Sequence, residues 1–379
     1  MEGIAPFHVM ELMAKAQALE AAGHDIIHME VGEPDFPTPP PILDAAQRFL
    51  AGGHVHYTSA LGLPALREAI AAWYATRYGV QVDPARIVVT AGASGALLLA
   101  LGVLTSPGDE WLLTDPGYPC NRHFVRFCEG VPRAIPVDAT THFQPTAQKV
   151  DAGWTAHTRG LLVASPANPT GTLIAPDELA ALWHTVRSHD GYLIVDEIYH
   201  GLTYGGEARS ALEISDDIIV INSFSKYFGM TGWRLGWLVV PPQLLRAVEK
   251  LAQNLYIAPS TPAQHAALAA FAPETIAILE ARREEFRQRR DLLLPGLRRI
   301  GFDIATEPQG AFYIYAGLDA LGKDSFELAE RLLVDAGVAA TPGLDFGDQA
   351  PARHMRFAYT TTMERLTLGL ERLSAFFSA

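Results

Sequence analysis

Short apolar runs alternate with helical patterns along the middle of the chain. Runs at residues 86–90, 111–114, 160–165, 192–196, 218–222 and 235–240 have the length and composition of buried strands. Segments with helical spacing of apolar positions lie between them, for example 93–104 and 176–189. Strand–helix alternation of this kind predicts an α/β fold whose mainly parallel sheet is covered by helices on both faces.

The two ends of the chain follow a different pattern. The first residues, to about 28, predict an irregular arm and one amphipathic helix, whereas 273–300 predict a long charged helix with a break near Pro295 and Gly296. Shorter strand and helix signals continue to residue 379. We therefore expect an arm and part of a small domain at 1–40, a large domain at 41–275, and the rest of the small domain at 276–379.

Composition narrows the function classes. The 379 residues are 49% hydrophobic and 19% charged, which is typical of a compact globular protein, and the formal charge is −13. An acidic chain without basic blocks argues against a nucleic-acid partner. No signal peptide and no apolar stretch of membrane-spanning length are found, so we expect a cytoplasmic protein that binds no membrane. Two cysteines and scattered histidines show no metal-ligand spacing, and we expect no metal.

Lys226 is the most unusual polar residue of the chain. It is one of only five lysines and lies between aromatic residues in the segment SFSKYFGMTGWRLGW. Burial lowers the pKa of a lysine and makes the neutral amine a nucleophile. Ser223, Ser225 and Arg234 flank it, and hydroxyls with a guanidinium are suited to holding a phosphate.

Other polar groups follow the predicted strands, where ligands bind in open α/β sheets. The loop TAGASGA at 90–96 could present backbone N–H groups to an anion at a helix start. It could also carry a serine-hydrolase elbow at Ser94, although Ala96 stands where that motif needs glycine. Asp196 ends one apolar strand, with Tyr199 three residues later, and Asn168 lies in the proline-rich loop SPANPTG.

An amine nucleophile beside a phosphate site is what a pyridoxal phosphate enzyme needs. On this interpretation Lys226 binds the cofactor aldehyde as a Schiff base. Asp196 pairs with the pyridine nitrogen, and Tyr199 donates a hydrogen bond to the ring oxygen.

An ordered set of motifs then identifies a family. The segments PFHVMELMAKAQALEAAG, VGEPDFPTP, YTSALGLPALREAI, DPGYP, SPANPTG, DEIY, SFSKYFGMTGWRLGW, QGAFY and ARHMRFAYTT span nearly the whole chain. In this order they resemble class I/II aminotransferases, which are fold-type I pyridoxal phosphate enzymes of the aspartate aminotransferase superfamily. The resemblance implies a large domain with a seven-stranded, mainly parallel sheet and a smaller α/β domain from both chain ends.

The resemblance also implies residue roles. Lys226 matches the cofactor lysine, and Asp196, Tyr199 and Asn168 match ring contacts. The phosphate-binding, ring-stacking and substrate-binding positions match the following residues: Ala93, Ser94, Ser223, Ser225 and Arg234 for the phosphate; Tyr118 for stacking; Arg356, Asn168 and Gly32 for the substrate. Tyr57 matches a tyrosine that reaches the phosphate of the partner subunit, which implies a homodimer with shared active sites. Arg353 matches nothing and reads as a surface charge.

The expected reaction is transfer of an amino group from a neutral or aromatic L-amino acid to 2-oxoglutarate or pyruvate, by a ping-pong mechanism. Ser94 stands where one dicarboxylate-specific branch has a lysine, which disfavours aspartate as the donor. Residues near Phe7 and Val9, and around Tyr256, are candidates for the side-chain pocket. The alternatives are a C–S β-lyase on the same fold, a ligand-sensing domain without catalysis, and the serine hydrolase.

Overall fold

The computed structural model describes residues 8–206, 208–322 and 324–378. Its larger sheet has seven strands in the order β2-β8-β7-β6-β5-β3-β4. All neighbouring pairs are parallel except those of β8, which runs antiparallel to β2 and β7. The predicted seven-stranded, mainly parallel sheet is therefore confirmed. The strands are β2 (Ile87–Thr90), β3 (Glu110–Asp115), β4 (Val131–Pro136), β5 (Thr158–Ala164), β6 (Tyr192–Asp196), β7 (Ile219–Ser223) and β8 (Gly236–Val239).

One strand, β4, was not among the six apolar runs read from the sequence. Its residues VPRAIP include Pro132 and Pro136, and most of its side chains are exposed. Proline cannot donate to a strand ladder and is tolerated only at a sheet edge, which is where β4 lies. An edge strand needs neither a continuous apolar run nor a full set of donors, so its sequence signal is weak.

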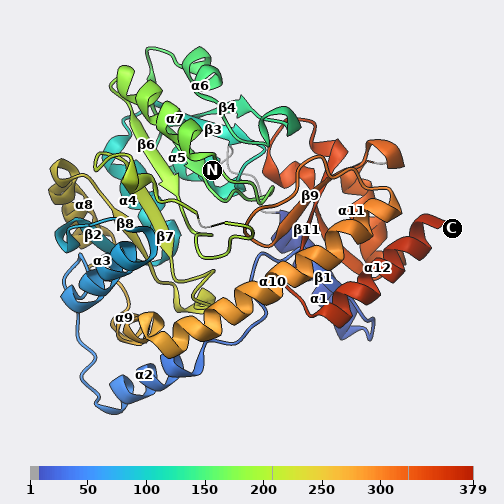
Figure 1. Ribbon diagram of the computed structural model, residues 1–379, viewed down its shortest axis with the longest axis horizontal. Helices are drawn as coiled ribbons and strands as arrows, with labels where there is room; N and C mark the ends of the chain where they lie inside the picture. Colours follow the sequence, from blue (N-terminus) through green and yellow to red (C-terminus); the bar gives the residue numbers. More distant parts are fainter. Residues whose placement is uncertain (1–7, 207, 323, 379) are drawn as a thin grey trace.

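Helices cover both faces of the large sheet (Figure 1). Alternate strand residues enter different clusters: Ile219 and Ile221 pack with α4 and α8, whereas Val220 packs with α3 and α7. This alternation follows from the two-residue period of a strand. The helices of this part are α2 (Pro40–Ala51), α3 (Pro64–Tyr78), α4 (Gly92–Leu104), α5 (Pro119–Phe127), α6 (Ala147–Gly153), α7 (Pro176–Ser188), α8 (Pro242–Leu255) and α9 (Thr261–Ala267).

A second sheet combines the two ends of the chain. Its order is β1-β10-β11-β9, with β1 parallel to β10 and the other pairs antiparallel. The domain boundaries stay a prediction, but strands from both chain ends share this sheet. The elements are β1 (Ile27–Met29), β9 (Tyr313–Gly317), β10 (Val338–Pro342) and β11 (His354–Ala358), with α1 (His8–Ala21), α11 (Ser325–Asp335) and α12 (Met363–Ser378).

Helix α10 (Pro273–Ile300) joins the two parts and runs diagonally across Figure 1. The predicted break near Pro295 and Gly296 is wrong, because the helix is continuous through both residues. Tertiary packing overrides the local preference here: Gly296 is buried, and a Cβ at this position would collide with the side chain of Leu370 on α12. The small residue permits a close approach of the two helices that compensates for the hydrogen bond lost at proline.

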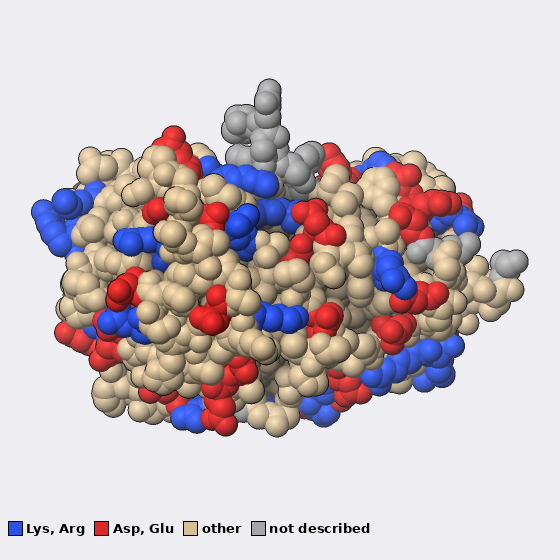
Figure 2. All heavy atoms as spheres, turned by 90° about the horizontal axis from the view of Figure 1, so that it is seen from above, with Lys and Arg blue, Asp and Glu red and all other residues tan. Residues whose placement is uncertain are grey.

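The surface mixes charges of both signs. On the face that Figure 2 shows, acidic and basic side chains of the described residues are interspersed over both parts of the molecule. Among the helices of the described ranges, none combines the length and apolar character that a membrane crossing requires.

Candidate active site

A cavity of about 320 Å³ lies between the two sheets. Its walls include the carboxyl ends of β5 and β6, the start of α4, Tyr313 of β9 and Arg356 of β11. The structure thus brings together most of the predicted site residues, which come from segments far apart in the chain: Gly32, Ala93, Ser94, Tyr118, Asn168, Asp196, Tyr199, Ser225, Lys226, Arg234 and Arg356.

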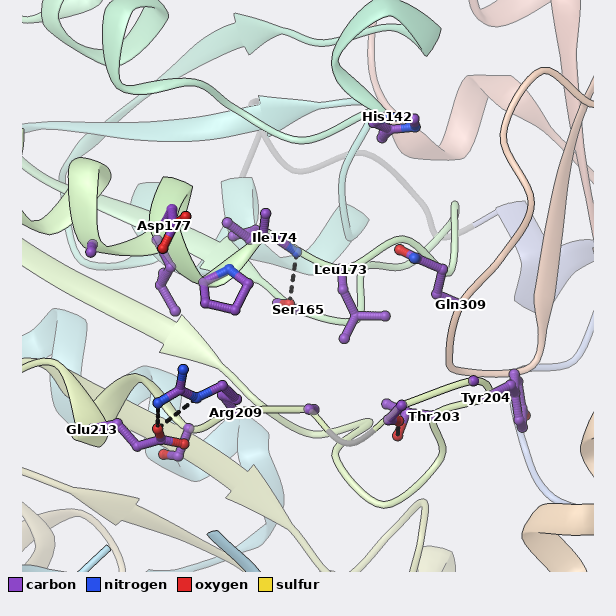
Figure 3. A pocket seen from close by; sticks show the side chains of 18 of the residues that line it. His142, Ser165, Leu173, Ile174, Asp177, Thr203, Tyr204, Arg209, Glu213 and Gln309 are labelled. Carbon is purple, nitrogen blue, oxygen red and sulfur yellow. Dashed lines mark hydrogen bonds and ion pairs between the residues drawn. The ribbon is translucent and has the colours of Figure 1, made fainter. Parts of the chain in front are cut away.

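A larger hollow, of about 910 Å³, lies elsewhere on the molecule and is drawn in Figure 3. It is lined by Leu173 and Thr203 in loops, by Asp177 in the first turn of α7, and by the ion pair between Arg209 and Glu213. None of the predicted site residues lines it. We therefore assign the candidate active site to the smaller cavity, because of the chemical groups that line it and not because of its volume.

Lys226 follows strand β7 and is partly buried among aromatic rings. Its Nζ donates a hydrogen bond to the carbonyl of Gly32 at 2.6 Å, and the rings of Phe312 and Tyr199 lie 5.7 and 6.0 Å away. Burial lowers the pKa of Lys226 to about 8, and the positive charges of Arg356 and Arg234 act in the same direction. The amine is therefore closer to its nucleophilic form at neutral pH than an exposed lysine would be.

Asp196 ends strand β6 and is buried. Its Oδ1 accepts a hydrogen bond from the backbone N–H of Ile198 at 3.0 Å. Burial raises the pKa of Asp196 to about 7, although this hydrogen bond and the charge of Lys226 act in the opposite direction. A carboxyl group held in this way is stabilised as an anion by any cationic group that enters the cavity.

Tyr199 and Tyr313 join the two sheets across the cavity. Their hydroxyl oxygens are 2.9 Å apart, and burial raises the pKa of both phenols. A Cβ at Gly32 would collide with the hydroxyl of Tyr313, so only glycine at position 32 leaves room for this hydroxyl beside Tyr199. Tyr313 belongs to the QGAFY motif, which contributed to the family resemblance, but the sequence analysis assigned it no role.

Arg356 is buried and its orientation is fixed. One guanidinium nitrogen donates to Oδ1 of Asn168 at 2.9 Å, and the other donates to the carbonyl of Glu30 at 2.5 Å and to Oγ1 of Thr341 at 3.2 Å. The guanidinium also lies 4.3 Å from the ring centre of Tyr313. These contacts hold a permanent positive charge in the cavity wall, where a carboxylate could bind in bidentate geometry.

Arg234 and the start of α4 form an anion-binding arrangement. The first backbone N–H groups of a helix lack intrahelical partners and attract anions. A Cβ at Gly92 would lie 2.9 Å from the Arg234 guanidinium, so glycine permits the side chain to approach this helix end. Ser225 lines the same cavity, and its hydroxyl lies 2.8 Å from that of Ser223, which is buried behind it.

Other predicted residues lie outside the cavity. Tyr57 is 80% exposed and Tyr256 does not line the cavity, whereas Val9 does; Phe7 lies outside the described residues. Arg353 is a surface charge, as predicted, and pairs with Asp319.

An apolar wall of the cavity lies near Val9, in one of the regions predicted to form the side-chain pocket. Val9, Met10 and Met13 of α1 line the cavity together with Leu97 of α4 and Ile198, which follows β6. Met10 and Met13 lie in the segment PFHVMELMAKAQALEAAG, which contributed to the family resemblance, but the motif gives neither residue a role. No local pattern distinguishes the cavity-facing side of this helix from its buried side.

Comparisons with known proteins identify the family of the chain. Residues 24–373 match the family model for aminotransferase class I and II. A valine–pyruvate aminotransferase of Mycobacterium tuberculosis is 41% identical over 99% of this chain and 97% of its own length. A (5-formylfuran-3-yl)methyl phosphate transaminase of Methanocaldococcus jannaschii is 36% identical over 98% of this chain and 96% of its own.

Solved structures agree as well. An aminotransferase from Mycobacterium tuberculosis superposes with a TM-score of 0.97 at 40% identity, over 100% of this chain and 98% of that one. The aspartate aminotransferase of Thermus thermophilus with maleate superposes with a TM-score of 0.93 at 36% identity, over 99% and 97%. Fold and sequence match over almost the full length of these enzymes. The chain therefore belongs to the class I and II aminotransferase family and is an aminotransferase.

Proposed function

We propose that the enzyme moves the amino group of a neutral or aromatic L-amino acid to 2-oxoglutarate or pyruvate, with pyridoxal 5′-phosphate as its cofactor. The observation that carries this proposal is the meeting of three chemically different groups in one cavity. They are the amine of Lys226, the buried carboxyl of Asp196, and the anion-binding arrangement of Arg234 with the start of α4.

These groups fit the cofactor, which has an aldehyde, a pyridine nitrogen and a phosphate. Lys226 would hold the aldehyde carbon, and Arg234 with Ser225 and the N–H groups at Ala93 and Ser94 would hold the phosphate. Asp196, buried and without a salt-bridge partner among the described residues, would hold the protonated pyridine nitrogen. When bound, the cofactor supplies an electron-withdrawing ring that stabilises negative charge on the substrate Cα.

The residues of this chain then bind the substrate, orient it and transfer a proton. Arg356 binds the substrate α-carboxylate, and Asn168, to which Arg356 donates a hydrogen bond, fixes the direction of the guanidinium. The amine of Lys226 would act as the general base that takes the proton from the substrate Cα and, once protonated, as the general acid. Tyr118 would stack its flat face on the cofactor ring, and Tyr199 would donate a hydrogen bond to the ring oxygen. The orientation of the substrate Cα–H bond accounts for much of the rate acceleration.

The cavity wall supports a neutral side chain on the substrate. Lys226, Arg234 and Arg356 are the lysines and arginines that line the cavity among the described residues, and each already has a role. A second substrate carboxylate would find no further cation there, whereas Val9, Met10 and Met13 offer apolar surface. The relative named valine–pyruvate aminotransferase supports the same substrate class, although others are named aspartate aminotransferases.

A homodimer with shared active sites would complete the cavity. Tyr57, implied by the resemblance to reach the partner's phosphate, is 80% exposed, and Val55, Leu255 and Ile257 are also exposed. Large apolar side chains that would otherwise stay in water support a subunit interface.

A half-reaction screen tests the function. The cofactor-loaded enzyme is mixed with single L-amino acids in the absence of an oxo acid, and the products are measured by mass spectrometry. We expect one equivalent of 2-oxo acid per active site from neutral or aromatic donors, and little from aspartate. Lys226→Ala should lower the rate by at least about 10²-fold, because it removes the general base.

Two results would contradict the proposal. Continuous release of pyruvate and ammonia from a thioether amino acid would instead identify a C–S β-lyase. Undiminished turnover by Lys226→Ala would remove the amine from the mechanism.

A further inference from the structure

Asp345 connects the start of helix α1 to the opposite end of the chain. Its Oδ1 accepts a hydrogen bond from the backbone N–H of His8 at 3.0 Å, and its Oδ2 accepts one from Val9 at 2.9 Å. The side chain is buried, on a short 3-10 helix (Gly343–Phe346) that follows β10. A carboxylate that accepts two N–H bonds at a helix start orients the first turn strongly, because ionised acceptors make the stronger hydrogen bonds.

This first turn forms part of the candidate active site. Val9, Met10 and Met13 line the cavity, and Val9 is itself one of the two residues that donate to Asp345. The following part of α1 is held differently, because Leu12 and Ala16 pack with Ile26, Leu333 and Ala339. An exposed ion pair between Lys15 and Glu330 adds to this packing, although such pairs contribute little.

The segment that contains Asp345 is in turn fixed on the large sheet. The carboxylate of Asp115, at the end of β3, accepts hydrogen bonds from the N–H groups of Asp348 at 2.9 Å and Gln349 at 3.2 Å. The carbonyl of Asp345 accepts a bond from Arg122 at 3.0 Å. Asp345 therefore lies between the end of β3 and the first turn of α1. Through these hydrogen bonds, the position of the strand end fixes the position of the first turn of α1.

We propose that Asp345 is a positioning residue for substrate selection: by holding the first turn of α1 against the cavity, it makes Val9, Met10 and Met13 the wall that receives an apolar substrate side chain. This inference rests on the proposed function and deepens it. Asp345 itself touches no reacting atom. Its loss should therefore weaken the preference for larger side chains more than it weakens the reaction itself.

The test compares Asp345→Asn with the wild-type holoenzyme. Asparagine keeps the size but replaces one acceptor with an N–H₂ group, which faces a backbone donor. We expect the ratio of kcat/KM for L-leucine to kcat/KM for L-alanine to fall about tenfold, within the range for lost side-chain contacts. Hydrogen exchange measured by mass spectrometry should speed up at residues 8–21. Glu330→Gln, which removes the exposed contact to the same helix, should change neither quantity.

A double-mutant cycle separates positioning from a general loss of structure. If Asp345 acts through α1, the effects of Asp345→Asn and Val9→Ala on the ratio are not additive. Should Asp345→Asn fail to fold, Asp345→Glu is measured in the same way; it keeps the charge but moves the oxygens, so the ratio should also fall.

Two outcomes overturn the inference. One is an equal loss of kcat/KM for leucine and alanine, and the other is unchanged exchange at residues 8–21 together with an unchanged ratio. A wild-type enzyme that produces no 2-oxo acid from any amino acid would instead contradict the proposed function. The exchange measurement on α1 does not depend on that result.

Discussion

At the scale of single residues, the candidate site depends on two groups whose pKa values burial moves toward each other. The pKa of Lys226 falls to about 8 and that of Asp196 rises to about 7. Both shifts have burial as their largest cause, because a low-dielectric environment disfavours the charged form of either group. The amine thereby becomes reactive near neutral pH, and the carboxyl becomes sensitive to the charge of whatever binds beside it.

The lowered pKa of Lys226 predicts the pH dependence of cofactor attachment to the apoenzyme. Only the neutral amine attacks the aldehyde, so the rate follows the deprotonated fraction, which is about one tenth at pH 7 and about one half at pH 8 for this pKa. Stopped-flow absorbance should show a rise of about fivefold between pH 7 and pH 8 and a plateau above about pH 9.

A free amine provides the control for that experiment. Nα-acetyllysine, with an ordinary lysine pKa near 10.4, should react with pyridoxal phosphate at a rate that keeps rising to about pH 10. If the protein followed the same curve as the free amine, Lys226 would be an ordinary exposed lysine.

Much of this site could be predicted from the sequence, and the reason is geometric. Asp196 and Lys226 end or follow neighbouring strands, so a parallel sheet brings them to one edge whatever the details of packing. Asp345 and Met13 could not be predicted in the same way. Their positions depend on contacts between residues more than 300 apart in the chain, as in the bond from Val9 to Asp345.

At the scale of elements, α10 shows how one helix stabilises the loop beside the site. Arg289 is 1% exposed and donates to Asp35 at 2.7 and 3.0 Å and to Glu285 at 2.6 Å. Its guanidinium also lies 4.8 Å from the ring centre of Phe36. Asp35 follows the segment that contains Gly32, whose carbonyl accepts the hydrogen bond of Lys226.

Replacing Arg289 should therefore destabilise the fold more than its charge alone suggests. Arg289→Ala removes a buried ion-pair partner and its ring contacts, so the free energy of unfolding should fall by roughly 3 kcal/mol. Urea denaturation followed by circular dichroism measures this change.

Arg287 on the same helix is the matched control. Its side chain is 39% exposed and pairs with Glu284 and Asp291, and exposed pairs contribute about 1 kcal/mol or less. If Arg287→Ala and Arg289→Ala lowered the free energy of unfolding equally, the burial of Arg289 would contribute nothing to stability.

The elements also show where reading the sequence fails. The pattern at 273–300 indicated the helix, but the predicted break relied on the local effect of Pro295. Gly296 contacts α12, which lies near the end of the chain, and the sequence of residues 273–300 gives no indication of that contact. For β4 the failure was the reverse: a strand was missed because its edge position tolerates prolines that a central strand would exclude.

At the scale of the whole molecule, the exposed apolar residues of the part built on the seven-stranded sheet predict a dimer. Tyr57 is 80% exposed, and Ile257 and Leu255 at the end of α8 are exposed as well. Analytical ultracentrifugation should give a mass of about 82 kDa, which is twice the chain mass of 41.1 kDa. Because the proposed role of Tyr57 is in the partner's site, the specific activity should also decrease when the enzyme is diluted.

A negative charge introduced on the apolar surface tests this assembly against a simple loss of folding. Tyr57→Asp should shift the enzyme toward the monomer and lower its activity, because a buried unpaired carboxylate is costly at an interface. Val334 on α11 is 68% exposed, and Val334→Asp is the control, since it introduces the same charge on the other part of the molecule. It should leave both mass and activity unchanged. An active 41.1 kDa species that persists at all concentrations would show that one chain completes its own cavity, and Tyr57 would then have no part in the phosphate site.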